Sequence, residues 1–330
     1  MDLNNRNGLI SIIIPTYNRA DFLAEISVPS VIKQNNRKWE LLIIDDGSVD
    51  DTKKIAESFL KEDRRIRYFY KENGGQGSAR NFGLKKSLGD YVLFLDSDDA
   101  LLPTSLDFFY KYINSCAVDI LFSWRFIFSK KTNNFKIIGV GGPSPSSVLY
   151  KKSFCESHPY SEDRNLIGLE DAELTLRIEN DIFGGSNVKM MHADTPTVLY
   201  MDHPQQITND NTPRLLVKME KLVSFVNTLE NVEKSSVCKK IIHLGHLCAL
   251  TGDIKVAREH FLKSFVYKKT VAGVFLYSLT FLGKGFYKIS MTMLKNTKDF
   301  IVMKVLLLYV FIKHTPRFFE SRAFLGTLTK

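Results

Sequence analysis

The sequence has few of the features that mark exported, membrane-spanning or disulfide-bonded proteins. Its 330 residues include 4 cysteines, which show no CxxC pair and no zinc-type spacing with histidine, so we expect a reduced, cytoplasmic protein. The first residues lack the basic start, long apolar centre and cleavage site of a signal peptide. The apolar run at 302–312 is interrupted by Lys304 and is shorter than the roughly 20 residues that span a bilayer.

Several motifs of catalysis and nucleotide binding are also missing. No GxSxG elbow or Cys/His pair supports covalent catalysis. The glycine-rich segment 73–77 has neither the GxGxxG spacing of a dinucleotide loop nor the GK[ST] of a P-loop. Lys and Arg outnumber Asp and Glu by 45 to 36, a balance that suits phosphate ligands, nucleic acid or an anionic membrane. Because no RNA motif, zinc finger or basic heptad region is present, we expect no nucleic-acid partner.

What the first half of the sequence does contain is an alternation of apolar, strand-like runs with amphipathic helix patterns. The expected strands cover 9–18, 39–48, 66–73 and 90–99, and the expected helices cover 21–34, 50–63 and 77–88. Beyond residue 100 the pattern is mixed, with helices expected at 103–115 and 169–180, a strand at 118–129 and a Gly/Pro/Ser loop at 139–147. Strands and helices that alternate through short loops indicate an α/β fold with a Rossmann-like, doubly wound, mostly parallel sheet.

The strand signals fade after about residue 210, where apolar residues recur at helical spacing. We therefore predict two parts, an α/β domain over 1–208 and an all-helical region over 209–330. In 263–330, Lys and Arg mix with aromatic and aliphatic residues. This mixture fits helices that lie on an anionic lipid surface or bind a partner, and it fits solvated helix faces over an ordinary core equally well.

Polar and acidic motifs stand where the predicted strands end. They are Pro15-Thr16-Tyr17-Asn18, Asp45-Asp46-Gly47-Ser48, Asn73-Gly74-Gly75 and Asp96-Ser97-Asp98-Asp99. Each alone is explained by a turn or a helix cap. Since ligands of such sheets bind at the carboxyl ends of the strands, we expect the four motifs to line one site. Three carboxylates within four residues repel one another unless a cation or a set of donors compensates them.

Five motifs together resemble the family 2 glycosyltransferases, which have the GT-A fold. They are SIIIPTYNR, LLIIDDGSVDDT, ENGGQGSARNFGL, YVLFLDSDD and GLEDAELTLR, within about 9–205. The resemblance implies an inverting enzyme of the kind that builds bacterial cell-surface polysaccharide. It also implies a nucleotide-sugar donor, expected to be a UDP-sugar, and a divalent metal, Mn²⁺ or Mg²⁺, which the aspartate oxygens suit.

The resemblance assigns site residues by position. The nucleotide-sugar ligands are expected to be Pro15, Thr16, Tyr17, Asn18, Asp46, Gly75, Arg80, Asp96, Ser97 and Asp98. Thr16 and Asp46 are expected in the base pocket, where Asp46 accepts from an imide N–H. Arg80 is expected near the base or the diphosphate, with a surface salt bridge as the alternative. The expected metal ligands are Asp98, Asp99 and His203, although His203 also suits a structural role, and the order of ligation among the aspartates stays open.

Two acidic residues at a predicted helix start are the expected catalytic groups. By resemblance, Asp171 takes the proton of the acceptor hydroxyl and Glu170 braces the site or binds the acceptor. A single base opposite the leaving group gives direct displacement with inversion. The helix N-terminus lowers the pKa of Asp171, whereas the like charge of Glu170 raises it. The simpler alternative is that both residues only satisfy the first helical turn.

The acceptor is expected to be a saccharide or a lipid-linked hydroxyl at the inner face of the cell membrane, where the protein is expected to be peripheral. Two other functions remain open. A sugar nucleotidyltransferase shares a related sheet but usually carries a Gly-rich basic loop after its first strand, which the segment 15–22 lacks. A non-catalytic carbohydrate-binding or scaffold protein would keep the motifs without turnover.

Overall fold

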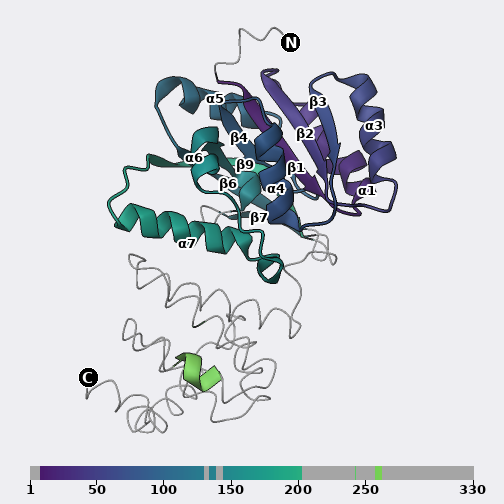
Figure 1. Ribbon diagram of the computed structural model, residues 1–330. Coiled ribbons are helices and arrows are strands. Elements are labelled where there is room, and N and C mark those ends of the chain that lie inside the picture. Colours follow the sequence, from purple (N-terminus) through teal and green to yellow (C-terminus); the bar gives the residue numbers. More distant parts are fainter. Residues whose placement is uncertain (1–7, 130–133, 139–143, 203–241, 243–256, 262–330) are drawn as a thin grey trace, which may run out of the picture. The chain divides into compact units, whose positions relative to one another are not determined.

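The computed structural model describes residues 8–129, 134–138, 144–202, 242 and 257–261 (Figure 1). Contacts divide the chain into two units, residues 1–209 and 210–330, and nearly all described residues belong to the first unit. The predicted all-helical region and His203 therefore lie outside the described residues, apart from a few positions. Within the described residues, no helix combines the length and apolar character that crossing a membrane requires.

A nine-stranded sheet is the centre of the first unit. Its strands are β1 (Ile10–Thr16), β2 (Trp39–Asp45), β3 (Ile66–Tyr70), β4 (Tyr91–Phe94), β5 (Ala100–Leu101), β6 (Ile120–Ser129), β7 (Asn134–Ile138), β8 (Val148–Lys151) and β9 (Met190–Asp202). Their order is β3-β2-β1-β4-β8-β6-β9-β5, and β7 pairs with β6. The strands β3, β2, β1 and β4 are parallel, as predicted.

The second half of the sheet is mixed. β8 runs antiparallel to both β4 and β6, whereas β6 and β9 are parallel. The sequence analysis did not predict β5, β7, β8 or β9. β5 and β8 have only 2 and 4 residues, too few for a period to show, and β9 mixes polar residues and a proline with its apolar ones.

Helices connect the strands. They are α1 (Ala20–Phe22), η1 (Leu23–Ser27), α2 (Val28–Ile32), α3 (Thr52–Glu62), α4 (Gln76–Lys86), α5 (Ser105–Ser115), η2 (Pro145–Ser147), α6 (Lys152–Ser157), η3 (Arg164–Leu166) and α7 (Glu170–Phe183). The helix expected over 21–34 is thus present as α1, a π-helical turn and α2. Pro29 has no N–H to donate within α2, which accounts for the irregular turn before it.

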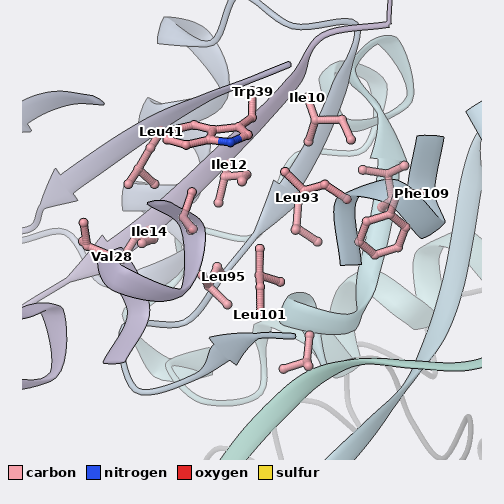
Figure 2. Packing of buried hydrophobic residues seen from close by; sticks show 14 of the residues in the cluster. Ile10, Ile12, Ile14, Val28, Trp39, Leu41, Leu93, Leu95, Leu101 and Phe109 are labelled. Carbon is pink, nitrogen blue, oxygen red and sulfur yellow. The ribbon is translucent and has the colours of Figure 1, made fainter. Parts of the chain in front are cut away.

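Alternate residues of the buried strands face two separate cores. Ile10, Ile12 and Ile14 of β1 pack with residues of α2 and α5 (Figure 2), and the same cluster includes Ala56 of α3. Ile13 packs on the opposite face with residues of α4, α6 and α7. Helices therefore cover both faces of the sheet, as the doubly wound prediction requires. Each fully buried isoleucine contributes roughly 1.5–3 kcal/mol, so this core fixes the strand ends that carry the polar motifs.

Candidate functional site

A cavity of about 570 Å³ opens at the carboxyl ends of β1, β2 and β4, within the range typical of ligand pockets. The predicted residues that line it are Pro15, Thr16, Tyr17, Asp46, Gly75, Arg80, Asp96, Ser97, Asp98, Glu170 and Asp171. Asn73, from the third strand-end motif, also lines it. Lining residues that the sequence analysis missed are Arg19, Gln76, Ala79, Arg125, Ser144, Pro145, Ile167, Gly168 and Tyr200. The fold thus brings motifs that are far apart in sequence to one place.

Two predicted residues lie outside this lining. Asn18 has a positive φ of 53°, donates its N–H to Ser48 Oγ at 2.8 Å and accepts from the Val49 N–H at 2.8 Å. These bonds tie the loop after β1 to the loop after β2, so Asn18 shapes the pocket rather than lining it. Asp99 is buried, with 1% of its surface exposed.

Asp46 holds the glycine-rich loop in place. Its carboxylate accepts from Lys71 Nζ at 2.6 Å and from the N–H groups of Gly74 and Gly75 at 2.9 and 2.7 Å. Gly75 adopts φ +91°, a left-handed conformation that favours glycine. A carboxylate has about four lone-pair sites. Asp46 therefore has little more than one site left for a ligand and is chiefly a loop anchor.

Arg80 lies at the centre of three carboxylates. Its Nη2 is 2.8 Å from Asp96 Oδ1, and its Nη1 is 2.9 Å from Glu170 Oε1 and 3.5 Å from Asp171 Oδ1. The guanidinium also stacks on the Tyr160 ring at 4.9 Å, and only 1% of Arg80 is exposed. The surface salt bridge considered from the sequence is therefore wrong. Arg80 is a buried counter-ion that joins the acidic loop after β4 to the start of α7.

Neighbouring residues of α4 fix this arrangement. The Asn81 side chain donates to the Tyr160 carbonyl and accepts the Tyr160 N–H, both at 2.9 Å. A Cβ on Gly77 would overlap the carbonyl oxygen of Ser161, so glycine lets the start of α4 approach that backbone closely. The GSARN motif thereby docks α4 against the segment that leads into α7. The close approach that Gly77 permits is to the Ser161 backbone.

Asp171 is poised between its two protonation states near neutral pH. The pKa of Asp171 is raised to about 8: burial is the largest cause, the charges of Glu170 and Asp96 add to it, and those of Arg80 and Arg125 oppose it. About 34% of the side chain is nevertheless open, and Asp171 lines the cavity. A carboxylate with a pKa near the working pH suits a general base.

The neighbouring carboxyl groups of the acidic loop after β4 raise one another's pKa. Burial and then the charges of Asp96 and Asp98 raise the pKa of Asp99 well above its usual range, and burial also raises the pKa of Asp96 despite Arg80. Neither carboxyl oxygen of Asp99 has a hydrogen bond of good geometry within the described residues, although Ser146 lowers its pKa.

A divalent cation fits this loop only if the protein supplies some of its ligands and the diphosphate and water supply the others. Within the described part of the chain, no group of three His, Cys, Asp or Glu side chains converges as a metal site. Metals that bind diphosphates typically take one or two protein carboxylates and complete their coordination with water and phosphate oxygens. Asp98, which lines the cavity, and Asp99, whose carboxyl oxygens have no hydrogen bond of good geometry within the described residues, suit that smaller contribution.

Two missed residues, Arg125 on β6 and Tyr200 on β9, form part of the cavity wall. A signal for Arg125 was available, because it is the one charged residue in the apolar strand 120–129. Tyr200 gave no comparable signal, because β9 itself was not predicted.

The geometry places the chain among proteins of known class. Residues 11–166 match the family model described as Glycosyl transferase family 2. TarS 1–349 from S. aureus in complex with UDP-GlcNAc has 18% identity and a TM-score of 0.54, covering 82% of this chain and 78% of that one. The mannosyltransferase PcManGT from Pyrobaculum calidifontis, in complex with GDP-Man and Mn²⁺, has 14% identity and a TM-score of 0.56, covering 94% and 88%.

Curated relatives match over shorter segments. An uncharacterized glycosyltransferase of Rickettsia bellii is 43% identical over 108 residues, 33% of this chain and 15% of that protein. The putative teichuronic acid biosynthesis glycosyltransferase TuaG of Bacillus subtilis is 44% identical over 98 residues, 29% and 38% of the two chains. The matched segments thus span well under half of these relatives.

Fold and sequence together define the class. The sheet and its helices have the GT-A fold of glycosyltransferases, so the resemblance in fold is confirmed. Residues 11–166, slightly less than half of the chain, match glycosyl transferase family 2 in sequence.

Proposed function

We propose that the chain is an inverting glycosyltransferase that moves a sugar from a UDP-sugar to a hydroxyl of a saccharide or lipid-linked acceptor in cell-surface polysaccharide synthesis. The observation that carries this proposal is that one cavity holds both the acidic loop after β4 and Asp171, whose pKa is raised to about 8. The first offers ligands for a metal-bound diphosphate, and the second offers a base for the acceptor hydroxyl.

The nucleobase is proposed to bind between Thr16 and Asp46. Thr16 Oγ1 is buried and has no hydrogen-bond partner within the described residues, and Asp46 keeps an acceptor site beyond its loop bonds. A hydroxyl beside a carboxylate complements the carbonyl and imide N–H of uracil. A donor of this class is also consistent with the UDP-GlcNAc complex of TarS.

The metal is proposed to lie against Asp98, which lines the cavity, with buried Asp99 beside it and His203 as a further ligand outside the described residues. A bound Mn²⁺ or Mg²⁺ would stabilise the negative charge that grows on the departing diphosphate. Asp96 is proposed to stay with Arg80, which it contacts at 2.8 Å.

Asp171 is proposed to accept the proton of the acceptor hydroxyl while that oxygen attacks the anomeric carbon and the nucleoside diphosphate leaves on the opposite side. Such a direct displacement inverts the anomeric centre. Arg80 and Glu170 orient the base: Arg80 contacts both carboxylates, and Glu170 Oε2 accepts the Gly168 N–H at 2.5 Å. Glu170 is therefore a positioning residue in this proposal.

A donor screen tests the proposed function. UDP-sugars with Mn²⁺ should raise the melting temperature of the full chain more than GDP-sugars, because the proposed pocket complements the carbonyl and imide N–H of uracil. A ligand at 100 times its Kd adds about 2.7 kcal/mol to the unfolding free energy. Asp98→Asn and the chelator EDTA should each remove the shift, whereas the exposed control Asp51→Asn should keep it. Equal stabilisation with EDTA would contradict the metal, and pyrophosphate release from UTP would favour a nucleotidyltransferase.

The pH dependence of turnover should show the titration of Asp171. The base acts only when deprotonated, so kcat/KM should fall about tenfold per pH unit below the pKa of the free protein, near 8. A rate profile between pH 5.5 and 9.5 measures this acid limb, the fall in rate below the pKa of Asp171. The acid limb of kcat, measured at saturating donor and Mn²⁺, should lie at lower pH, because a nearby cation favours the carboxylate form of Asp171.

The variant Glu170→Gln tests whether the acid limb belongs to Asp171. Glu170→Gln removes a like charge that raises the pKa of Asp171, so the acid limb should move to lower pH even if the maximal rate drops. A limb that stays in place, or moves to higher pH, would contradict Asp171 as the titrating base.

The proposed peripheral contact with an anionic membrane at the cytoplasmic face rests on the basic, aromatic-rich segment 263–330, which lies outside the described residues. Pelleting with phosphatidylglycerol liposomes tests it directly.

A further inference from the structure

Arg125 is partly buried and, unlike the buried Arg80 of the same cavity, has no carboxylate hydrogen-bonded to it within the described residues. Arg80 contacts three carboxylates, whereas within the described residues the Arg125 guanidinium has a recorded contact with the Tyr200 ring alone, 5.3 Å from its centroid. Both residues line the cavity. A guanidinium carries five N–H donors in a planar fork that matches carboxylate and phosphate oxygens, and here that fork faces the space where substrates bind.

An irregularity in the sheet produces the Arg125–Tyr200 pair. Phe122 pairs with His192 and Arg125 pairs with Val198, so three steps along β6 correspond to six along β9. Strict alternation from His192 would turn Tyr200 to the face of Phe122, opposite to Arg125. The three extra residues of β9 reverse that parity.

After the irregularity the pairing is regular again. Tyr200 pairs with Ile127, which shares a face with Arg125 two residues before it, so the guanidinium and the ring are diagonal neighbours. β-Bulges often re-aim side chains beside active sites. The aromatic platform under Arg125 is thus built by the register shift of β9.

The position of the pair places it on the acceptor side of the cavity. Thr16 and Asp46 follow β1 and β2, which lie toward one end of the sheet, whereas β6 and β9 lie beyond β8 toward the other end. The charge of Arg125 reaches Asp171 and lowers its pKa. An acceptor whose hydroxyl meets Asp171 therefore presents its neighbouring groups to Arg125.

We propose that Arg125, supported by Tyr200, binds an anionic group of the acceptor, a carboxylate or a phosphate adjacent to the hydroxyl that is glycosylated. This inference rests on the proposed function and adds the chemical class of the acceptor to it. The charges of Asp99 and Asp171 interact with Arg125 without a direct hydrogen bond within the described residues. A neutral acceptor would leave the donor fork without an anionic hydrogen-bond partner, whereas an anion forms charge-assisted, bidentate hydrogen bonds with it.

Matched pairs of small probes test the proposal on the full chain. Methyl β-glucuronide and methyl β-glucoside differ in a carboxylate, and glycerol 3-phosphate and glycerol differ in a phosphate. Affinities are measured by NMR titration, with and without UDP and Mn²⁺. The anionic member of at least one pair should bind roughly tenfold tighter than its neutral counterpart, the usual gain from a charged hydrogen bond, and the pair that shows the preference identifies carboxylate or phosphate as the group.

Variants assign that preference to the site. Arg125→Gln should abolish it, Arg125→Lys should keep part of it, and Tyr200→Phe should keep more of it than Tyr200→Ala. Arg64→Gln, at an exposed arginine, should leave it unchanged. UDP affinity with Mn²⁺ should be the same in the wild type and in Arg125→Gln.

Two results would overturn the inference. One is equal affinity for anionic and neutral probes in the wild type. The other is a loss of UDP affinity in Arg125→Gln, which would make the guanidinium a donor contact. The probes are also measured without UDP, so the two proposals can fail separately. If the chain does not bind UDP, the proposed donor is contradicted, whereas the preference for anionic probes still tests the role of Arg125.

Discussion

Asp171→Asn is expected to lower kcat by about 10² to 10⁴-fold, the usual contribution of a general base, with little change in Mn²⁺-dependent UDP affinity. The amide has nearly the shape of the carboxylic acid but does not take up the proton of the acceptor hydroxyl. Arg80 keeps its contacts with Asp96 and Glu170 at 2.8 and 2.9 Å, so the donor side of the cavity should stay in place. Transfer is measured as UDP release in the presence of acceptor, and UDP affinity by calorimetry.

Asp107→Asn is the matched control, because Asp107 also stands in the first turn of a helix, α5, but is exposed and outside the cavity. It should transfer sugar at the wild-type rate. Wild-type turnover in Asp171→Asn would refute the assignment of the base. A loss of UDP affinity as large as the loss of turnover would instead give Asp171 a role in donor binding.

Arg80→Met is expected to cost about 3–5 kcal/mol of unfolding free energy, the usual result of removing one partner from a buried ionic cluster, and to abolish transfer. Asp96, Glu170 and Asp171 would then face one another without the cation that now lies 2.8, 2.9 and 3.5 Å away. Urea denaturation at pH 8 measures the loss. Arg80→Lys keeps the charge but loses the planar fork, so an intermediate value is expected.

A double variant separates charge from packing. Adding Glu170→Gln to Arg80→Met removes one of the stranded charges, so it should recover part of the stability, although Glu170→Gln alone destabilises the wild type. Lys53→Met serves as control, since Lys53 pairs with Glu57 at the exposed surface of α3 and should cost about 1 kcal/mol or less. Unchanged stability in Arg80→Met, or no recovery in the double variant, would contradict the role of Arg80 as counter-ion.

The sequence by itself determined the class of fold and the place of the site. Runs rich in β-branched residues, such as 10–14, favour strands buried on both faces. Their alternation with helix patterns predicted the parallel half of the sheet, which β1 to β4 confirm. Since parallel strands end at one edge, motifs that follow them were expected together, and one cavity gathers most of them. The roles assigned to the individual residues stay predictions.

Only the tertiary structure decided which arginine pairs with which carboxylates, because that pairing depends on contacts between residues far apart in sequence. Arg80 and Glu170 are separated by 90 positions, and no local pattern shows that α4 buries this arginine against α7. The same holds for Arg125 and Tyr200, whose contact depends on three extra residues in β9. Periodicity determines which face a side chain occupies within one strand. A register shift between two strands changes which residues pair, but the hydrophobic pattern of neither strand shows it.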